Sequence, residues 1–413
     1  MHTRGLASAV LNFNRFPEFV VVVVRAYCWL AIDHYYDDFI YVDLASARRS
    51  GLRCLEAVIS MIGNGPRHPN APIRSPELDP SKTQEPGTNN VVLGVHADTS
   101  RAASDSIILF TPTPARVDSI LLDFRAAFDR GRLTPGEAAR LRGRLQFCLV
   151  AAYGCVGRAA TLPLVSRQYR DVKDSFRTDS ELYQSLLFFE ALLPSLPPLE
   201  VHLAAPRARP LLVYTDAAFF LRRSFDRRDA TCGAPHESEL RGGLGVVIYD
   251  PEDGSVRWAS GKPDWAVLLS VWPRDRKTYI AQLEVLAAIS AYFTFPELFV
   301  GRRVHHWVDN TVGLSALVHG YSGKADLAKM VNVFYLQVAG LRTSVYFDYV
   351  PSKANIADLP SRDAFDELEH ELRGLHVARA LPGGLSVPSF LQWRAPLASW
   401  VTRFLHLPGN WAA

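Results

Sequence analysis

Apolar residues recur at helical spacing in two separate blocks of the first half of the chain. The first block, residues 1–62, ends in a predicted helix whose apolar positions share one face: Leu52, Leu55, Val58, Ile59 and Ile62. The second block, residues 91–203, contains a helix predicted to begin after Thr134, which can cap it. Pro135 fits the first helical position and Glu137 completes a capping box. Between the blocks, residues 63–90 are rich in proline and polar residues, which predicts a flexible linker or an inserted loop.

The pattern changes after a proline-rich boundary that ends at Pro210. Five apolar runs of strand length follow, at Leu211–Thr215, Gly242–Tyr249, Val256–Ser260, Arg303–Val308 and Ser344–Tyr349. A helical pattern lies between the third and fourth runs. Residues 210–373 are therefore predicted to form one domain of strands and helices, and residues 374–413 a tail without a readable period. The predicted fold class is α/β and α+β, multidomain.

Composition narrows the class of protein. The 413 residues suffice for two or three domains, and 48% hydrophobic residues exclude global disorder. The five cysteines are odd in number and form no CxxC pair, which indicates a reducing compartment without a zinc site or disulfide framework. An intracellular protein, cytoplasmic or nuclear and not secreted, is therefore expected.

One apolar run, Phe19–Ile32, raises the question of a membrane span or a secretory signal. Arg25 interrupts it, and it is shorter than the ~20 residues that a spanning helix needs. Polar residues dilute the stretch before it, and no clean cleavage pattern follows. A buried core element, with no membrane association, is the better interpretation.

Four acidic residues occupy positions from which their carboxylates can converge. Asp216 and Asp309 follow apolar runs, Glu284 lies on the predicted helix, and Asp358 begins a helix after a loop. Clustered carboxylates suit hard cations such as Mg²⁺ or Mn²⁺, and two such ions can cleave a phosphodiester. Each acid alone is weak evidence, because an Asp after a strand is more often a turn residue or a helix cap.

Five motifs together resemble the retroelement branch of the ribonuclease H family. They are Thr215-Asp216-Ala217-Ala218, Gly242-Gly243-Leu244-Gly245, Gln282–Ala287, Val308-Asp309-Asn310 and Asn355–Arg362. The resemblance implies a mixed five-stranded sheet flanked by helices, and a two-metal site that hydrolyses the RNA strand of an RNA–DNA hybrid. Its catalytic and metal-binding residues would be Asp216, Glu284, Asp309 and Asp358. Residues of the same motifs implied to contact nucleic acid are Asn310, Asn355 and Arg362.

Two departures from the family pattern stand out. The separation of Asp216 and Glu284 is longer than usual, and the extra residues are predicted to be surface insertions at Arg222–Ser238 and Pro263–Lys277. The loop Tyr349–Ala354 lacks the histidine that helps product leave the metals in many family members. Slower turnover with intact metal ligands is therefore expected.

A second resemblance lies upstream. Tyr35-Tyr36-Asp37-Asp38 resembles the Tyr-x-Asp-Asp hairpin of reverse transcriptases, whose paired Asp bind metals beside the primer 3′-hydroxyl. Gly5–Arg15 resembles the preceding palm motif, Val92–Val95 the primer grip and Leu133–Leu145 the thumb. The overall likeness, across about Gly5 to Arg362, is to the reverse transcriptase and ribonuclease H polyprotein of DIRS-like or related retrotransposons.

That likeness implies a partial palm at residues 1–62 and a primer-grip, thumb and connection region at residues 91–203. The family's fingers and its first palm aspartate precede these motifs, and the chain starts too late to contain them. We therefore expect a truncated reverse transcriptase in which Tyr35, Asp37 and Asp38 are a polymerase remnant. This chain alone is not expected to polymerise; whether a partner supplies the fingers, and the oligomeric state, stay open.

Positive charge is concentrated between Arg125 and Arg177, where eleven Arg or Lys face four Asp or Glu. Such a stretch is either a solvated helix face or a surface that contacts phosphates. The resemblance favours the second, with Arg140 and Arg144 binding DNA, RNA or their hybrid.

A different class of function remains as the alternative: a catalytically silent nucleic-acid-binding relic or a domesticated interaction protein. All four acids are present, which favours the enzyme, whereas the missing histidine and fingers leave room for the relic. A proofreading exonuclease would need an acid at Ala218, and a DDE-type transposase a Glu in place of Asp358.

Overall fold

The computed structural model describes residues 7–47, 49–63, 78, 83–170, 176–204, 208–221, 236–274, 276, 278–375, 384–388 and 397–405. The predicted linker 63–90, the Arg222–Ser238 insertion and the tail 374–413 therefore lie largely outside the described residues. The chain divides into two compact units, Met1–Ser104 and Asp105–Ala413, and each is described by itself.

The first unit is built on two helices and a hairpin. Helix α1 (Ala7–Cys28) is followed by strands β1 (Ala31–Tyr35) and β2 (Asp38–Val42), which pair antiparallel, and by helix α2 (Ser50–Gly63). A second antiparallel hairpin consists of β3 (Asn89–Val92) and β4 (Val95–Asp98). The predicted helix at the end of the first block is confirmed as α2.

The apolar run of the first block lies mostly on α1, and only one side of it is core. Val20, Val21 and Val24 are buried against α2, whereas Phe19 and Val22 are each about half exposed. Within the described part of the chain, no helix combines the length and the apolar character needed to cross a membrane.

The second unit begins with a group of helices. Helices α3 (Pro114–Arg130), α4 (Pro135–Val150), α5 (Leu162–Tyr169) and α6 (Glu181–Leu192) follow β5 (Ile107–Pro112), which pairs antiparallel with β6 (Leu199–His202). The predicted capping box before α4 is confirmed, because Thr134 Oγ1 accepts from the backbone N–H of Glu137 and Glu137 Oε2 accepts from that of Thr134. The apolar face predicted for α4 is buried, including Leu141 and Leu145.

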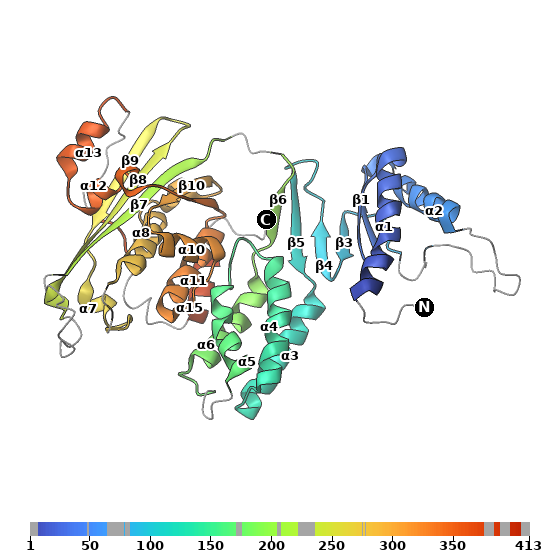
Figure 1. The fold of residues 1–413 in the computed structure, drawn as a ribbon, viewed down its shortest axis with the longest axis horizontal. Coiled ribbons are helices and arrows are strands. Elements are labelled where there is room, and N and C mark those ends of the chain that lie inside the picture. Colours follow the sequence, from blue (N-terminus) through green and yellow to red (C-terminus); the bar gives the residue numbers. More distant parts are fainter. Residues whose placement is uncertain are drawn as a thin grey trace, which may run out of the picture. The chain divides into compact units, whose positions relative to one another are not determined.

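The second unit also contains a mixed five-stranded sheet with helices packed against it (Figure 1). Its strands are β7 (Leu211–Leu221), β8 (Leu240–Asp250), β9 (Ser255–Gly261), β10 (Arg303–Val308) and β11 (Ser344–Tyr349). Their order is β11-β10-β7-β8-β9. Strand β8 is antiparallel to both of its neighbours, β7 and β9, and β10 is parallel to both of its neighbours, β7 and β11. The prediction of a mixed five-stranded sheet flanked by helices is confirmed.

Helices cover both faces of this sheet. Helix α8 (Ile280–Thr294) packs on β7 and β8 and against α11 (Ala325–Gly340), while α12 (Asp358–Ser361) packs on the opposite side against β7, β8 and β9. The next helix, α13 (Phe365–Glu371), contacts α12. Its residue Leu368 belongs to a small hydrophobic core on the α12 side of the sheet. The remaining helices among the described residues are α7 (Trp265–Leu268), α9 (Pro296–Phe299), α10 (Thr311–His319) and α15 (Leu397–Leu405).

Helix α15 contributes to the hydrophobic core of the second unit. It packs against α6 on one side and α11 on the other, and its residues Trp400, Val401 and Phe404 are buried. One continuous hydrophobic core therefore runs from α3 to the sheet.

Short 3₁₀ helices connect the elements of the chain, at Ala45–Ala47, Ala159–Thr161, Leu193–Ser195, Glu237–Glu239 and Ser352–Ala354.

Candidate metal centre

Asp216 lies in the middle of a long strand. The sequence predicted that the strand ends at Thr215 and that Asp216 follows it; this was wrong, because β7 continues to Leu221. Asp216 pairs in register with Gly245 of β8 and is only 3% exposed. The apolar residues after Asp216 keep the strand in the sheet, so the acid is carried into the interior of the domain.

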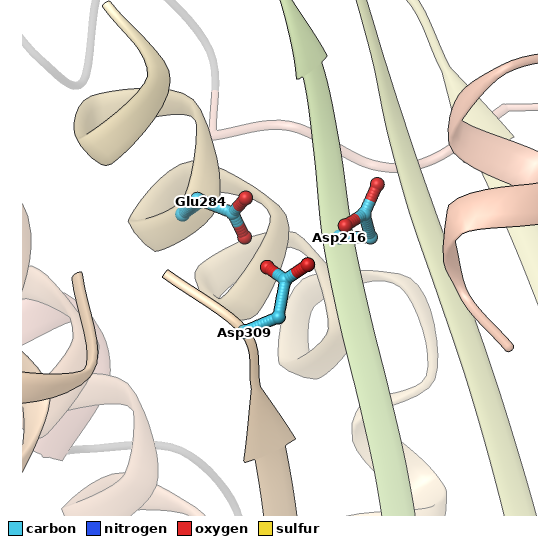
Figure 2. Close-up of side chains that lie close together, drawn as sticks. All are labelled: Asp216, Glu284 and Asp309. Carbon is cyan, nitrogen blue, oxygen red and sulfur yellow. The ribbon is translucent and has the colours of Figure 1, made fainter. Parts of the chain in front are cut away.

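Three carboxylates meet at this point of the sheet (Figure 2). Glu284 reaches it from α8 and is 2% exposed, and Asp309 follows directly after the last residue of β10. Asp216, Glu284 and Asp309 each offer an oxygen, and these oxygens lie within 4.8 Å of one another. They are the only such group of three or more His, Cys, Asp or Glu ligands that the described residues form.

Burial makes negative charge costly in this cluster. It raises the pKa of Asp216 to about 7, where the nearby charges of Asp309 and Asp358 add to the effect of burial and the Ser361 hydroxyl opposes it. Burial is also the main cause that raises the pKa of Glu284 well above its ordinary value, and repulsion from Asp216 and Asp309 raises it further. In the absence of a positive ion, the cluster therefore tends to hold protons.

The residues present fit a divalent cation. Glu284 Oε2 is buried and has no hydrogen-bond partner among the described residues, although it belongs to a carboxylate that faces two others. An unpartnered buried carboxylate oxygen is costly, and a cation would compensate it. Oxygen donors from three acids are the ligands that Mg²⁺ and Mn²⁺ prefer.

Asp358 is placed beside the cluster and not in it. It is the first residue of α12 and is half-buried, and its Oδ1 accepts from Arg362 Nε at 2.6 Å. Its charge still contributes to the raised pKa of Asp216. Arg362, predicted to contact nucleic acid, has a side chain that is 55% exposed and engaged with this carboxylate.

The glycines of the Gly-Gly-x-Gly motif explain how α12 approaches so closely. A Cβ on Gly243 would lie 1.8 Å from the carbonyl oxygen of Ser361, and one on Gly245 would lie 2.3 Å from that of Ala357. The backbone of α12 thus rests on a part of β8 that has no side chains. This arrangement brings the Ser361 hydroxyl to Asp216 Oδ2, at 2.5 Å.

Two asparagines of the predicted site hold the structure around the acids. Asn310 caps α10 and its Oδ1 accepts from the backbone N–H groups of Val312 and Gly313. Asn355 is 3% exposed and its Nδ2 donates to Thr215 O at 3.0 Å and to Asp216 Oδ1 at 3.4 Å. Contact of either side chain with nucleic acid stays a prediction.

The arginines predicted to bind phosphate share one acidic neighbour. Arg144 is paired with Asp123 of α3 and donates to Ser119, and Arg140 Nη2 lies 3.8 Å from the same Asp123 carboxylate. The Arg144 side chain is 27% exposed and that of Arg140 61%. Asp123 lies just before the Arg125–Arg177 stretch and neutralises part of its positive charge.

The upstream acids lie on the β1–β2 hairpin. Tyr35 ends β1, Asp38 begins β2, and Tyr36 takes a left-handed backbone conformation (φ 55°) in the turn with Asp37. All four residues are exposed. Across the described ranges no third carboxylate joins Asp37 and Asp38 in a group that could hold a metal.

Sequence reasoning missed three buried side chains near the acids. The first, Ser361, lies in the Asn355–Arg362 motif, but a serine three residues after a helix start looks like an ordinary surface residue. The other two, Thr215 and His306, bond to each other at 2.9 Å beneath the cluster, and an isolated histidine in a strand gave no signal of that contact.

No family model matches the sequence, and no curated protein matches it. Among solved structures, the chain is similar to the N-terminal RNase H domain of Rv2228c from Mycobacterium tuberculosis, solved as a fusion with maltose-binding protein. That match has 15% identity, covers 39% of this chain and 97% of the other, and has a TM-score of 0.25.

A second similar structure is RNase H1 from the halophilic archaeon Halobacterium salinarum NRC-1. It has 16% identity, covers 38% of this chain and 99% of the other, and has a TM-score of 0.24.

Proposed function

We propose that residues 210–373 are a ribonuclease H domain that hydrolyses the RNA strand of RNA–DNA hybrids with two divalent cations. The observation that carries the proposal is the meeting of Asp216, Glu284 and Asp309, whose oxygens lie within 4.8 Å of one another. The sheet order supports it, because Asp216 lies on β7, Asp309 directly follows the adjacent strand β10, and Glu284 lies on α8, which packs on β7. The five sequence motifs that resemble the retroelement ribonucleases H include all three.

Asp216, Glu284 and Asp309 would hold Mg²⁺ or Mn²⁺, and Asp358 would add a ligand from α12. Two bound ions can supply an activated water and stabilisation of the leaving oxygen of a phosphodiester. The chain itself excludes water around Glu284 by burial and orients Asp216 through Ser361 and Asn355. Because these acids hold protons when no cation is near, acid pH should weaken cation binding.

The test is a gel assay of the full chain on a labelled RNA–DNA hybrid with Mg²⁺ or Mn²⁺. Asp309→Asn is expected to abolish cleavage while leaving hybrid binding nearly intact, since it removes a metal ligand and no phosphate contact. Asp348→Asn is the matched control, because Asp348 lies on the neighbouring strand β11 with its side chain 50% exposed and outside the cluster. If the wild type and Asp309→Asn bind equally and neither cuts, the chain is a silent nucleic-acid-binding relic.

We also propose that residues 1–62 derive from a reverse transcriptase palm and that the chain does not polymerise by itself. The support is the Tyr-x-Asp-Asp motif on a β-hairpin, with Asp37 and Asp38 exposed and without a third carboxylate among the described residues. Incorporation of dNTPs by the purified chain on a primed RNA template would contradict this.

A further inference from the structure

Ser361 is a buried hydroxyl that contacts one of the candidate metal ligands. It is 1% exposed, and its Oγ lies 2.5 Å from Asp216 Oδ2 and 3.0 Å from the carbonyl oxygen of Asp358. A serine hydroxyl has one proton to donate, and the shorter contact goes to the carboxylate. Hydrogen bonds from a hydroxyl to an ionised carboxylate are short and strong.

The backbone that carries this hydroxyl is packed tightly against β8. A Cβ on Gly243 would lie 1.8 Å from Ser361 O, and one on Gly245 would lie 2.6 Å from Ser361 N. The peptide groups on both sides of Ser361 therefore rest directly on β8, the strand that pairs with β7. The backbone of Ser361 therefore cannot shift relative to Asp216 without lifting α12 off the sheet, and the hydroxyl reaches Asp216 from this seated backbone.

The other oxygen of Asp216 is held from the same segment. Asn355 Nδ2 lies 3.4 Å from Asp216 Oδ1 and 3.0 Å from the carbonyl oxygen of Thr215, which anchors the amide. With a donor at each oxygen, the Asp216 carboxylate cannot rotate freely. Each oxygen of Asp216 still has a lone pair that neither donor uses. The carboxylate that faces Glu284 and Asp309 can therefore still bind a cation.

We propose that Ser361 is a positioning residue of the metal centre, which fixes the Asp216 carboxylate in the orientation that a divalent cation requires. The proposal rests on the proposed function, because it assumes that Asp216 is a metal ligand. A ligand that is already oriented loses little freedom on binding the ion, so the hydroxyl raises cation affinity. Loss of such a supporting hydrogen bond typically weakens metal binding by about 10–100-fold.

The test measures Mn²⁺ binding to the full chain by calorimetric titration, without nucleic acid. Ser361→Ala is expected to raise the Kd by about tenfold or more, and Ser361→Thr, which keeps the hydroxyl, to stay within about threefold of wild type. Ser185→Ala is the matched control. Ser185 is also a buried serine, but it donates to the carbonyl oxygen of Ala160, so its loss should leave the Kd unchanged.

Thermal unfolding without metal shows which variants fold. If Ser361→Ala does not fold, Ser361→Cys replaces it, because a thiol is nearly the same shape but a weak donor, and its Kd should also rise. A Kd for the folded variant within about twofold of wild type overturns the positioning role, while the proposed function stands. A wild-type chain that binds no Mn²⁺ overturns the proposed function itself.

Discussion

His306 Nε2 lies 2.9 Å from the hydroxyl of Thr215, the residue immediately before Asp216. The other ring nitrogen of His306 lies 3.2 Å from the hydroxyl of Tyr292 on α8. All three side chains are buried or nearly so, and they come from β10, β7 and α8, the elements that position the three clustered acids. These two buried polar contacts therefore connect the three elements that position the clustered acids.

We predict that His306 makes the protein less stable in acid. Burial lowers the pKa of His306 to about 3, whereas an unfolded chain takes up the proton near its ordinary value of about 6.5. The unfolded state alone gains a proton as pH falls through 6.5, so stability falls with it. Between pH 7 and pH 5 the metal-free wild type should lose about 2 kcal/mol more than His306→Gln in denaturant unfolding. Parallel pH profiles for the two proteins would contradict this.

Asp216 should act in the opposite direction. Its pKa of about 7 lies above that of an unfolded aspartate, so its contribution to stability is present at low pH and lost as pH rises through 7. In EDTA, the free energy of unfolding of Asp216→Asn should increase relative to that of the wild type as pH rises from 4 to 8, by at most about 4 kcal/mol. Added Mg²⁺ should stabilise only the wild type. The exposed change Asp348→Asn serves as control, and an Asp216→Asn protein that follows wild type at every pH would refute the raised pKa.

Gly245→Ala should damage both the fold and the cleavage activity. The new Cβ would lie 2.3 Å from Ala357 O, so α12 must move and carry Ser361 and Asp358 with it. We expect a loss of about 1–3 kcal/mol in the free energy of unfolding and loss of hybrid cleavage. Gly143→Ala is the control, because nothing lies near its Cβ position on α4, and there alanine should stabilise by up to about 1 kcal/mol. An active Gly245→Ala protein would show that α12 need not be seated on β8.

Hybrid binding should depend on Arg140 more than on Arg144. Arg140 is mostly exposed, whereas Arg144 is held by Asp123 and Ser119. Arg140→Ala should weaken binding to any hybrid sequence and lower the slope of log affinity against log salt by about 0.9, and Arg144→Ala by less. Asp123→Asn should strengthen binding by releasing both arginines. If neither arginine alters affinity or its salt dependence, the stretch is only a solvated face.

The sequence was sufficient for features that depend on local pattern. The bounds of β10 and β11 match the predicted strands, because each run alternates or stays apolar and is bounded by turn residues. The end of β7 was predicted wrongly, because an acid after an apolar run usually marks a strand end. The donors Ser361 and Asn355, and the absence of side chains at Gly243 and Gly245, accommodate Asp216 inside the domain as part of the strand.

What the sequence could not provide are contacts between distant segments. Asp123 on α3 neutralises arginines on the next helix, α4. Thr215 on β7 contacts His306 on the neighbouring strand β10. Neither partner is recognisable without the fold, since each residue alone has an ordinary surface or core role. The convergence of three of the four predicted acids was expected from the sequence, because neighbouring strands and a helix packed on one sheet bring their residues together, although Asp216 lies within β7 and not at its end. The engagement of Asp358 by Arg362 was not.

The place of α15 also affects how the chain is made. Its residues Trp400 and Phe404 complete the core against α6, although α6 precedes α15 by on the order of 200 residues. At a synthesis rate of about 5–20 residues per second, α6 waits roughly 10–40 s for this partner. During that interval the part of α6 that α15 will cover is open to other contacts. Helper proteins that shield apolar surfaces during translation should therefore improve the yield of folded chain.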